Sequence, residues 1–454
     1  MKPILLVANR GEIACRVLRA ARALSLQTVA VYSQADSELP HVGMADVAVE
    51  IGPARPAESY LNVPAVLEAA RTHGATMIHP GYGFLSENAA FARACGDAGI
   101  RFVGPTPEVI SLMGDKDRAR QAASAAGVPV LPGSGKLDPL DEVAVLAAGE
   151  KTGYPLLVKA AAGGGGIGMK SVSRPEDLVA TVATTSGMAQ KAFGDGSVYL
   201  ERYVQRARHV EIQLFGFGDG TAVHLFERDC SLQRRHQKVV EEARAPFISE
   251  AVRSRMAEAA VGLAKACSYQ GAGTVEFLYD TRTEEFFFLE MNTRIQVEHP
   301  VTEMITGIDL VAAQIRLAMG ESLHAELAQD RIMAHGHAVE VRVYAENPAK
   351  NFLPSPGPLV EFHVPSGPHV RVDTGYREGN KVTPFYDPMV MKVIAHGADR
   401  AQAIDRLQGA LANARVSGIA NNITYLRKVL DHPAFLAGDL HTGFLGEHHP
   451  LLLA

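Results

Sequence analysis

The most concentrated chemical signal in the sequence is a run of glycines after a short apolar segment. The run reads Gly163-Gly164-Gly165-Gly166-Ile167-Gly168-Met169, and it follows the strand-like residues 156–160, which include Lys159. Glycines let backbone amides approach an anion closely, because no side chain intervenes and a positive φ costs little. The segment therefore predicts a flap over the phosphates of a nucleotide, with Lys159 placed to reach them. A merely flexible loop is the alternative.

Two familiar nucleotide patterns can be tested on the same segment. Gly163, Gly165 and Gly168 formally satisfy Gly-x-Gly-x-x-Gly, but a strand-like segment follows where a dinucleotide site needs a helix. The Walker pattern fails too, because Met169 separates the last glycine from Lys170. A lid over nucleotide phosphates, lying between two strands, remains the prediction.

A pair of glutamates on a predicted antiparallel hairpin is the second signal. Strand-like runs at 274–278 and 285–290 flank a polar turn. If the turn is centred near Thr283, Glu276 and Glu290 lie opposite each other on one face. Two such carboxylates repel unless a cation lies between them, and magnesium prefers oxygen ligands, of which Asn292 offers a third. A solvated hairpin with two exposed glutamates is the alternative.

Polar residues continue at every second position after this hairpin. Asn292, Arg294, Gln296 and Glu298 alternate with less polar residues, so their side chains are expected on one face, beside the metal. This pattern is unusual for a core strand. It favours a site that binds a small anion.

The elements that must position these residues begin with a parallel α/β unit. We expect strands at 4–8, 28–32, 77–79 and 102–103, and helices at 13–24, 64–71 and 88–98. This alternation predicts a doubly wound sheet. The first strand is followed by Asn9-Arg10-Gly11-Glu12-Ile13, without a dinucleotide fingerprint.

Two further units are expected downstream. The second begins around Gly114 and includes a strand at 156–160 and the hairpin, and the third is β-rich and runs from about His337 to the end. Helices at 400–413 and 422–430 are expected to close the third unit.

Composition excludes several classes of function. The chain has 454 residues, 47% hydrophobic and 21% charged, with a formal net charge of −6, and Lys and Arg are scattered without a basic tract. Nucleic acid is therefore not expected as a partner. The four cysteines are far apart, with neither metal-ligand nor disulfide spacing, and no stretch has the length of a signal peptide or a membrane span. We expect a soluble, unprocessed cytoplasmic protein that does not associate with membranes.

Long motifs in consistent order along the whole chain resemble the biotin carboxylase family. Besides the glycine run and the hairpin, they are Ala8-Asn9-Arg10-Gly11-Glu12-Ile13-Ala14, His79-Pro80-Gly81-Tyr82-Gly83-Phe84-Leu85-Ser86-Glu87-Asn88, the segment 227–242, Arg294-Ile295-Gln296-Val297-Glu298 and Tyr386-Asp387-Pro388-Met389. The resemblance implies a fold of the α/β and α+β type with three domains. These are an N-terminal α/β domain (1–114), an ATP-grasp domain (115–334) with a lid at about 131–203, and a β-rich C-terminal domain (335–454).

The resemblance also implies a set of ATP-binding residues. Phosphate contacts are expected from Lys116, Lys159 and the glycines and Met169 of the lid. The base and ribose are expected to lie near Glu201, Val204, His209, Gln233, His236 and Leu278. Glu276 and Glu290, adjoined by Asn292, are the implied ligands of magnesium or manganese.

The remaining implied site residues bind bicarbonate and biotin. Bicarbonate is expected to contact Lys238, Arg294, Gln296, Glu298 and the backbone of Val297, with Glu298 as the general base. Arg342 is expected to stabilise charge on biotin, with Tyr82 nearby.

The implied activity is that of a ligase that forms a carbon–nitrogen bond, carboxylating biotin with ATP and bicarbonate as the first half-reaction of an acetyl- or propionyl-CoA type carboxylase. A biotin carboxyl carrier, expected on another chain, and a carboxyltransferase are the implied partners, and a homodimer is the implied assembly. A urea-type carboxylase component, another ATP-grasp carboxylate–amine ligase and a non-enzymatic nucleotide-binding regulator are the alternatives.

Some residues depart from the family pattern or have a structural explanation. Ile167 occupies a lid position that is often basic in the family, and Arg244 stands where a proline is common. His79, His299 and Cys230 are expected to be structural, and Glu87 either contacts substrate or caps a helix. The segment Met389-Val390-Met391-Lys392-Val393 superficially resembles a biotin attachment site, but its apolar strand pattern argues against that role.

Overall fold

The computed structural model describes residues 3–160, 169–193, 195–235 and 237–453. These residues form two compact units. The first unit comprises residues 1–128, 209–277 and 289–454, and the second comprises residues 129–208 and 278–288. Ile167 and the predicted lid glycines lie outside the described residues.

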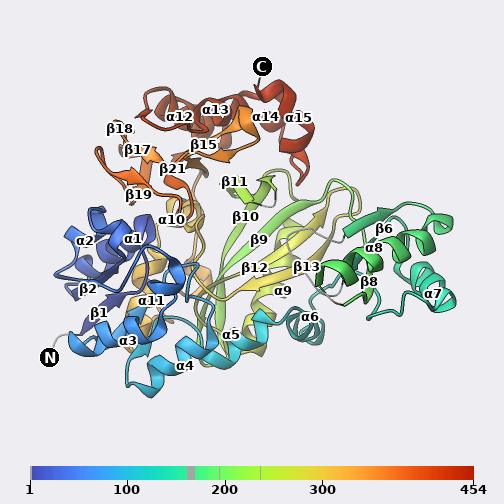
Figure 1. Cartoon of the computed structure of the whole chain (residues 1–454), viewed down its shortest axis with the longest axis horizontal. Coiled ribbons are helices and arrows are strands. Elements are labelled where there is room, and N and C mark those ends of the chain that lie inside the picture. The colour runs from blue at the N-terminus through green and yellow to red at the C-terminus, as the bar shows by residue number, and fades with distance from the viewer. Residues whose placement is uncertain (1–2, 161–168, 194, 236, 454) are drawn as a thin grey trace. The chain divides into compact units, whose positions relative to one another are not determined.

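A five-stranded parallel sheet begins the first unit, in the order β3-β2-β1-β4-β5 (Figure 1). Its strands are β1 (Ile4–Val7), β2 (Gln27–Tyr32), β3 (Val47–Glu50), β4 (Met77–His79) and β5 (Arg101–Phe102). They alternate with helices α1 (Gly11–Ala23), α2 (Pro40–Met44), α3 (Val63–Thr72) and α4 (Ala89–Asp97). The doubly wound sheet expected from the alternating pattern is confirmed, while the short strand β3 and the short helix α2 went unpredicted.

The second large sheet has eight strands, in the order β13-β12-β9-β10-β11-β14-β21-β19. Its strands are β9 (Arg208–Phe217), β10 (Ala222–Arg234), β11 (Gln237–Ala243), β12 (Gln270–Asp280), β13 (Glu285–Asn292), β14 (His337–Tyr344), β19 (Val370–Thr374) and β21 (Met389–Gly397). The predicted hairpin strands are therefore neighbours, as β12 and β13. The C-terminal strands β14, β21 and β19 extend the same sheet.

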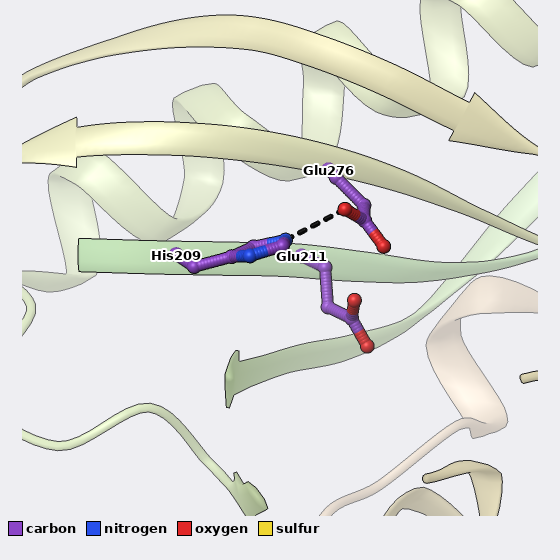
Figure 2. A group of neighbouring side chains, drawn as sticks. All are labelled: His209, Glu211 and Glu276. Atoms are coloured by element: carbon purple, nitrogen blue, oxygen red, sulfur yellow. Dashed lines mark ion pairs between the residues drawn. The ribbon is translucent and has the colours of Figure 1, made fainter. Parts of the chain in front are cut away.

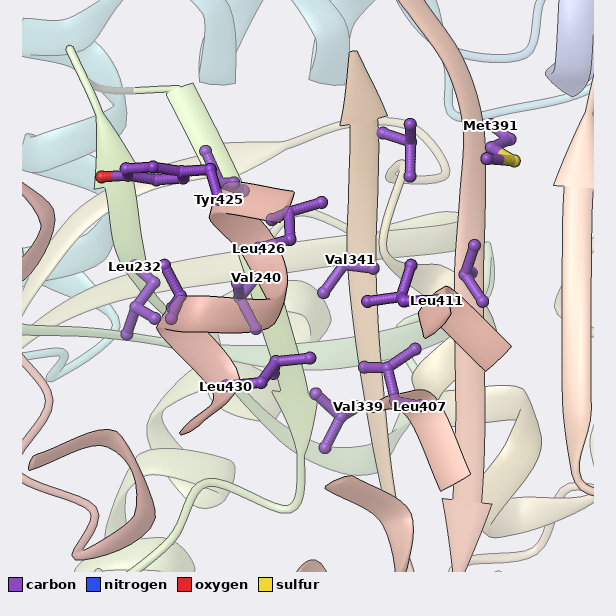
Figure 3. Packing of buried hydrophobic residues seen from close by; sticks show 14 of the residues in the cluster. Leu232, Val240, Val339, Val341, Met391, Leu407, Leu411, Tyr425, Leu426 and Leu430 are labelled. Carbon is purple, nitrogen blue, oxygen red and sulfur yellow. The ribbon is translucent and has the colours of Figure 1, made fainter. Parts of the chain in front are cut away.

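Alternating residues give this sheet two different faces. Val339, Val341 and Val343 of β14 pack into an apolar core with Leu407 and Leu426, as Figure 3 shows in part. The core is closed by α12 (Arg400–Ala412), α13 (Ile423–Asp431), α14 (Pro433–Leu436) and α15 (Phe444–Leu453). Because side chains alternate along a strand, the charged residues between these valines face the opposite side.

The remaining helices of the first unit connect or cover these sheets. They are α5 (Pro107–Gly114), α6 (Lys116–Ala125), α9 (Glu250–Ala266), α10 (His299–Thr306) and α11 (Leu310–Ala318). Pairs of very short strands complete the C-terminal part: β15 (Glu346–Asn347) with β16 (Leu353–Pro354), β17 (Gly357–Pro358) with β20 (Lys381–Val382), and β18 (Glu361–His363) with β22 (Arg415–Ser417). Across the described chain, we find no helix with both the length and the apolar character needed to cross a bilayer.

The second unit is a small three-stranded sheet in the order β7-β6-β8, accompanied by two helices. Its elements are β6 (Leu156–Ala160), β7 (Met169–Val172), β8 (Val198–Arg202), α7 (Glu142–Thr152) and α8 (Leu178–Phe193). β6 pairs antiparallel with β7, and Lys159 lies opposite Met169. The glycine-rich segment thus joins two adjacent antiparallel strands, as its sequence predicted.

Arg244 and Lys392, which the sequence singled out, both lie in the first unit. Arg244 lies next to two glutamates, with Nε 3.2 Å from Glu227 Oε1 and Nη2 3.0 Å from Glu250 Oε1. Lys392 lies on β21 and is completely buried. A lysine in that position is not accessible for attachment of biotin, which agrees with the prediction.

A buried ion pair at Glu242 should make the stability of the first unit depend on pH. Its carboxylate is 2.7 Å from His337 Nε2 and 2.7 Å from Arg400 Nε. Burial alone would raise the pKa of Glu242, but Arg400 and His337 outweigh burial and lower the pKa to about 2. Since the ordinary pKa is 4.5, the ionised carboxylate stabilises the fold above about pH 4.5, and this stabilisation is lost as the pH falls toward 2.

We expect Glu242→Gln to destabilise the protein by about 3 kcal/mol at neutral pH, because a buried guanidinium loses its partner. In thermal unfolding, the difference in Tm from the unaltered chain should be the same at pH 7 and pH 6 and should narrow at pH 4. Glu68→Gln, which removes an exposed ion pair with Arg71, should change Tm little at any pH. A Glu242→Gln difference that does not narrow with acidification would contradict the assignment.

Candidate active site

The site is centred on the ammonium group of Lys238, which lies among three carboxylates. Its Nζ donates to Glu211 Oε2 at 2.8 Å, to Glu276 Oε1 at 2.9 Å and to Glu298 Oε1 at 2.7 Å. These residues come from β11, β9, β12 and the loop before α10. Burial lowers the pKa of Lys238, but the surrounding negative groups outweigh burial and raise the pKa well above its ordinary value. The lysine is therefore held in its charged form.

Glu298, the predicted general base, lies between two cations. Besides Lys238, it accepts a hydrogen bond from Arg342 Nη2 at 2.9 Å. Burial favours the protonated form of Glu298, but Lys238 and Arg342 outweigh burial and lower its pKa far below the ordinary value. The carboxylate is thus ionised at neutral pH. Arg342 is shared with Glu241, at 2.6 Å from its Nε, and burial raises the pKa of Glu241 to about 7.

Glu276 is contacted by four polar side chains. Its Oε1 accepts from Lys238, from Asn292 Nδ2 at 2.9 Å and from Gln296 Nε2 at 2.8 Å, and His209 Nε2 lies 2.7 Å from its Oε2. Figure 2 shows His209 and Glu276 facing each other, with Glu211 beside them. Burial opposes ionisation, but Lys238 and His209 outweigh it and lower the pKa of Glu276. Glu276 is therefore an anion despite being buried.

Gln233 and His209 form one hydrogen-bonded unit. Gln233 Nε2 donates to His209 Nδ1 at 2.6 Å and to the Cys230 carbonyl at 2.8 Å. Acceptance at Nδ1 leaves the proton on Nε2, toward Glu276. His236 lies outside the described residues, so its predicted position cannot be compared with this pair.

The oxygen atoms near Glu276 suit a hard divalent cation. The side chain of Glu290 is partly exposed to solvent, yet desolvation by the surrounding protein and the charge of Glu276 raise its pKa, and Lys238, His209 and Lys116 partly offset the shift. Two carboxylates that disfavour each other's ionisation gain from a shared cation, and the predicted ligands Glu276, Glu290 and Asn292 fit magnesium by donor type. A tighter set of atoms among the described residues is His209, Glu211 and Glu276, of which sequence reasoning named only two.

Arg294 is fixed by residues distant in sequence. Its Nε donates to Glu87 Oε2 at 2.8 Å and its Nη2 to Asn292 Oδ1 at 2.8 Å. Glu87 also accepts from the Thr293 amide at 3.1 Å. Glu87 thus holds Arg294 in place, and the helix cap considered for it belongs to Asn88, whose side chain accepts from the Phe91 amide.

Sequence reasoning missed two important residues, Glu211 and Arg228. Arg228 is fully buried. It donates to Glu211 at 2.6 Å and to Gln296 Oε1 at 3.3 Å. Glu211 in turn accepts from Lys238. Both strands carry several polar residues, so no signal in the sequence singled out these two, which pair directly in the strand register.

Tyr82 and Arg342 line one cavity of about 500 Å³ in the first unit. Its wall also includes Arg294, Val297 and a group of aromatic residues, namely Phe84, Tyr344, Tyr376, Phe385 and Tyr386. The residues predicted for biotin therefore lie beside those predicted for bicarbonate. The cavity combines an apolar aromatic wall with the guanidinium groups of Arg10, Arg294 and Arg342, which suits a partly apolar ligand that develops negative charge.

The second unit holds several other predicted nucleotide residues, while Lys116 begins α6 in the first unit. Lys159 forms an ion pair with Glu201 on the neighbouring strand. Val204 is buried in a small apolar cluster against which Leu278 packs, while Met169 is exposed. The structure thus pairs Lys159 with Glu201, one of the residues predicted near the base and ribose, and groups Val204 and Leu278, two others of that set.

Residues expected to be structural are buried and hydrogen-bonded. His79 Nδ1 accepts from the Gly81 amide at 3.0 Å, and His299 Nδ1 donates to the Gln296 carbonyl at 2.7 Å. Burial lowers the pKa of both histidines. Cys230 is buried as well, and burial raises its thiol pKa, so it is not a reactive thiolate.

Family comparisons identify the three segments of the chain. Residues 1–110 match the "Biotin carboxylase, N-terminal domain", residues 115–326 the "Carbamoyl-phosphate synthase L chain, ATP binding domain", and residues 340–447 the "Biotin carboxylase C-terminal domain". Together these matches cover most of the chain and follow the order that the sequence motifs indicated.

Individual relatives agree with these matches. A biotin carboxylase of Halalkalibacterium halodurans is 52% identical over 98% of this chain and 97% of that protein. The mitochondrial methylcrotonoyl-CoA carboxylase subunit alpha of Glycine max is 49% identical over 98% of this chain, which spans only 60% of that longer subunit.

The structural comparison leads to the same family. The biotin carboxylase domain dimer of Hydrogenobacter thermophilus 2-oxoglutarate carboxylase, in complex with MgADP, ADP and bicarbonate, has a TM-score of 0.90 and 43% identity, covering 100% of this chain and 99% of that one. The fold, the site and the three comparisons confirm the predicted resemblance: this chain belongs to the biotin carboxylase family of ATP-dependent ligases.

Proposed function

We propose that this chain carboxylates biotin on a separate carrier protein, using ATP and bicarbonate through a carboxyphosphate intermediate. The observation that carries the proposal is the ionised Glu298 between Lys238 and Arg342, next to Gln296, Val297 and Arg294. This arrangement brings together a base, Glu298, and two cationic groups, Lys238 and Arg342. The guanidinium of Arg294 lies in the adjoining cavity wall. Bicarbonate activation needs such an arrangement.

In the first step, Glu298 takes the proton of bicarbonate while Lys238 and Arg294 stabilise the anion. The bicarbonate oxygen then attacks the γ-phosphorus of ATP, and the bond to the β-phosphate oxygen breaks to give ADP and carboxyphosphate. Lys116 and Lys159 are the proposed phosphate contacts. When bound, magnesium would neutralise phosphate charge, held by Glu276, Glu290 and Asn292.

In the second step, carboxyphosphate separates into carbon dioxide and phosphate, and the phosphate accepts the proton of a ureido nitrogen of biotin. That nitrogen forms a bond to carbon dioxide. Arg342 stabilises the negative charge that develops on the ureido oxygen, since a fixed guanidinium favours an oxyanion. Tyr82 forms part of the same cavity wall and is the proposed neighbour of the biotin ring.

The surrounding system is proposed from the relatives. We infer the first half-reaction of an acyl-CoA carboxylase, because methylcrotonoyl-CoA carboxylase subunits are among the matches. We propose that this acyl-CoA carboxylase is of the acetyl- or propionyl-CoA type, and the alternative is a urea-type carboxylase. A carrier protein and a carboxyltransferase complete the proposed assembly. The relative described as a dimer supports a homodimer, and the three domains at 1–114, 115–334 and 335–454 remain our proposal for the organisation.

The first test is the dependence of ATP cleavage on bicarbonate. We expect ADP release only when bicarbonate is present, and a higher rate when free biotin is added, because both substrates bind beside Glu298 and Arg342. The measurement is ADP release in bicarbonate-depleted and bicarbonate-supplemented buffer. Equal rates in both buffers would favour another ATP-grasp ligase, and no cleavage in either would favour a nucleotide-binding regulator.

Two substitutions should separate the chemical steps. Glu298→Gln should lower ADP release and carboxybiotin formation together, by about 10²–10⁴-fold, because the base acts before both. Arg342→Ala should lower carboxybiotin formation by about 10²–10³-fold while much of the biotin-independent ADP release remains. Parallel assays of ADP release and carboxybiotin formation in each variant distinguish the roles of Glu298 and Arg342. Equal losses of both products in Arg342→Ala, or retained ADP release in Glu298→Gln, would reverse these roles.

A further inference from the structure

Lys392 is a completely buried lysine that the proposed chemistry does not use. It lies on β21, directly opposite Arg342 of β14 in the strand register. Its Nζ donates to the carbonyl of Val297 at 2.6 Å and lies 3.2 Å from Glu12 Oε1. A buried ammonium group is costly unless it is paired and hydrogen-bonded. These two partners are its nearest, and Asp373 Oδ2 lies further away at 4.0 Å.

The Val297 carbonyl belongs to the loop that carries the proposed base and the bicarbonate contacts. The preceding carbonyl, that of Gln296, accepts from His299 Nδ1 at 2.7 Å. Consecutive peptide groups are thus fixed by two buried side chains, His299 and Lys392. Because the ammonium group of Lys392 binds the Val297 carbonyl, a shift of this group changes the orientation of the peptide between Val297 and Glu298.

Glu12, the partner of Lys392, also contacts Tyr82. Glu12 lies in the first turn of α1, and the Tyr82 hydroxyl donates to Oε1, the same oxygen that faces Lys392. The close approach of α1 to the strand β19 depends on Gly375, where a Cβ atom would lie 2.2 Å from the carbonyl carbon of Gly11. Glu12 is therefore held in place by packing as well as by charge.

A continuous chain of contacts results, from Val297 through Lys392 and Glu12 to Tyr82. Three of these residues, Val297, Glu12 and Tyr82, line the same cavity of about 500 Å³. Only Lys392 lies behind the wall. The chain therefore connects the bicarbonate side of the cavity with its biotin side by a route that does not pass through the cavity itself.

We propose that the Glu12–Lys392 ion pair couples the biotin side of the cavity to its bicarbonate side. Biotin bound beside Tyr82 then favours the loop conformation in which Val297 and Glu298 activate bicarbonate. Glu12 and Lys392 are positioning residues, since they act through Tyr82 and Val297. The inference rests on the proposed function. Interactions between buried charges are strong because water screens them little, so a small change at Tyr82 alters the energy of the whole chain.

The test measures the stimulation ratio, which is the rate of bicarbonate-dependent ADP release with saturating free biotin divided by the rate without biotin. Glu12→Gln keeps the size of the side chain and an acceptor for Tyr82 but removes the charge that pairs with Lys392. Lys392→Met removes the contacts of the ammonium group with Val297 and Glu12, and its weaker contact with Asp373. We expect each substitution to lower the stimulation ratio at least about fivefold, the lower end of typical coupling between sites, while the rate without biotin falls less.

The double variant distinguishes coupling from independent damage. If Glu12 and Lys392 act as one pair, the double variant should have the same stimulation ratio as Lys392→Met alone. Lys392→Arg, which keeps the charge, should retain more of the ratio than Lys392→Met. Losses that multiply in the double variant would overturn the inference.

A matched control removes a buried ion pair elsewhere in the same unit. Arg400→Met breaks the contact with Glu242 and should lower Tm without changing the stimulation ratio. If Lys392→Met does not fold, Glu12→Gln alone decides, and an unchanged ratio in Glu12→Gln overturns the inference. If ADP release by the unaltered chain does not depend on bicarbonate, the proposed function itself is contradicted. Failure of the coupling inference and failure of the proposed function are therefore distinguishable.

Discussion

The structure of the site depends on one interaction, the contact of the Lys238 ammonium with three carboxylates. Glu211, Glu276 and Glu298 are each buried, and together they would repel one another in a medium that screens charge poorly. Lys238 makes this arrangement possible, with distances of 2.7 to 2.9 Å to all three. Because the carboxylates come from two strands and a loop, the same lysine also aligns the elements that carry them. Breaking a buried pair of this kind leaves an uncompensated charge, which costs about 3–5 kcal/mol.

The eight-stranded sheet allows such a charged centre to exist within a stable fold. On β14, valines face the core under α12 and α13, while Glu340 and Arg342 occupy the alternate positions. The apolar face supplies hydrophobic stabilisation, and the opposite face is left for charged groups that would not form a stable core alone. Register then brings Arg342 beside Lys392. The positions of Arg342, Lys238, Glu211 and Glu276 therefore follow from strand alternation and pairing, while Glu298 lies in the loop before α10.

Much of this arrangement could be predicted, because it follows from local patterns. Strand and helix periodicity predicted the N-terminal sheet. Polar alternation after the hairpin singled out Asn292, Arg294, Gln296 and Glu298, but the expected strand ends at Asn292 and the other three residues lie in a loop. Buried charges were harder, since Glu211 and Arg228 look like ordinary strand residues until their partners in other strands are known. Lys392 was judged only as a candidate attachment site. Its role depends on Glu12, which is distant in sequence, and no local pattern reports such a contact.

The central claim is that Lys238 and Arg342 keep Glu298 ionised. Infrared difference spectroscopy measures this directly, by subtracting the spectrum of Glu298→Gln from that of the unaltered chain over a range of pH. The lowered pKa of Glu298 predicts a carboxylate band, with no protonated carboxyl band, from pH 8 down to pH 5. A protonated band that grows in as the pH falls from 8 to 6 would contradict the account, because the proposed base would then be neutral when bicarbonate binds.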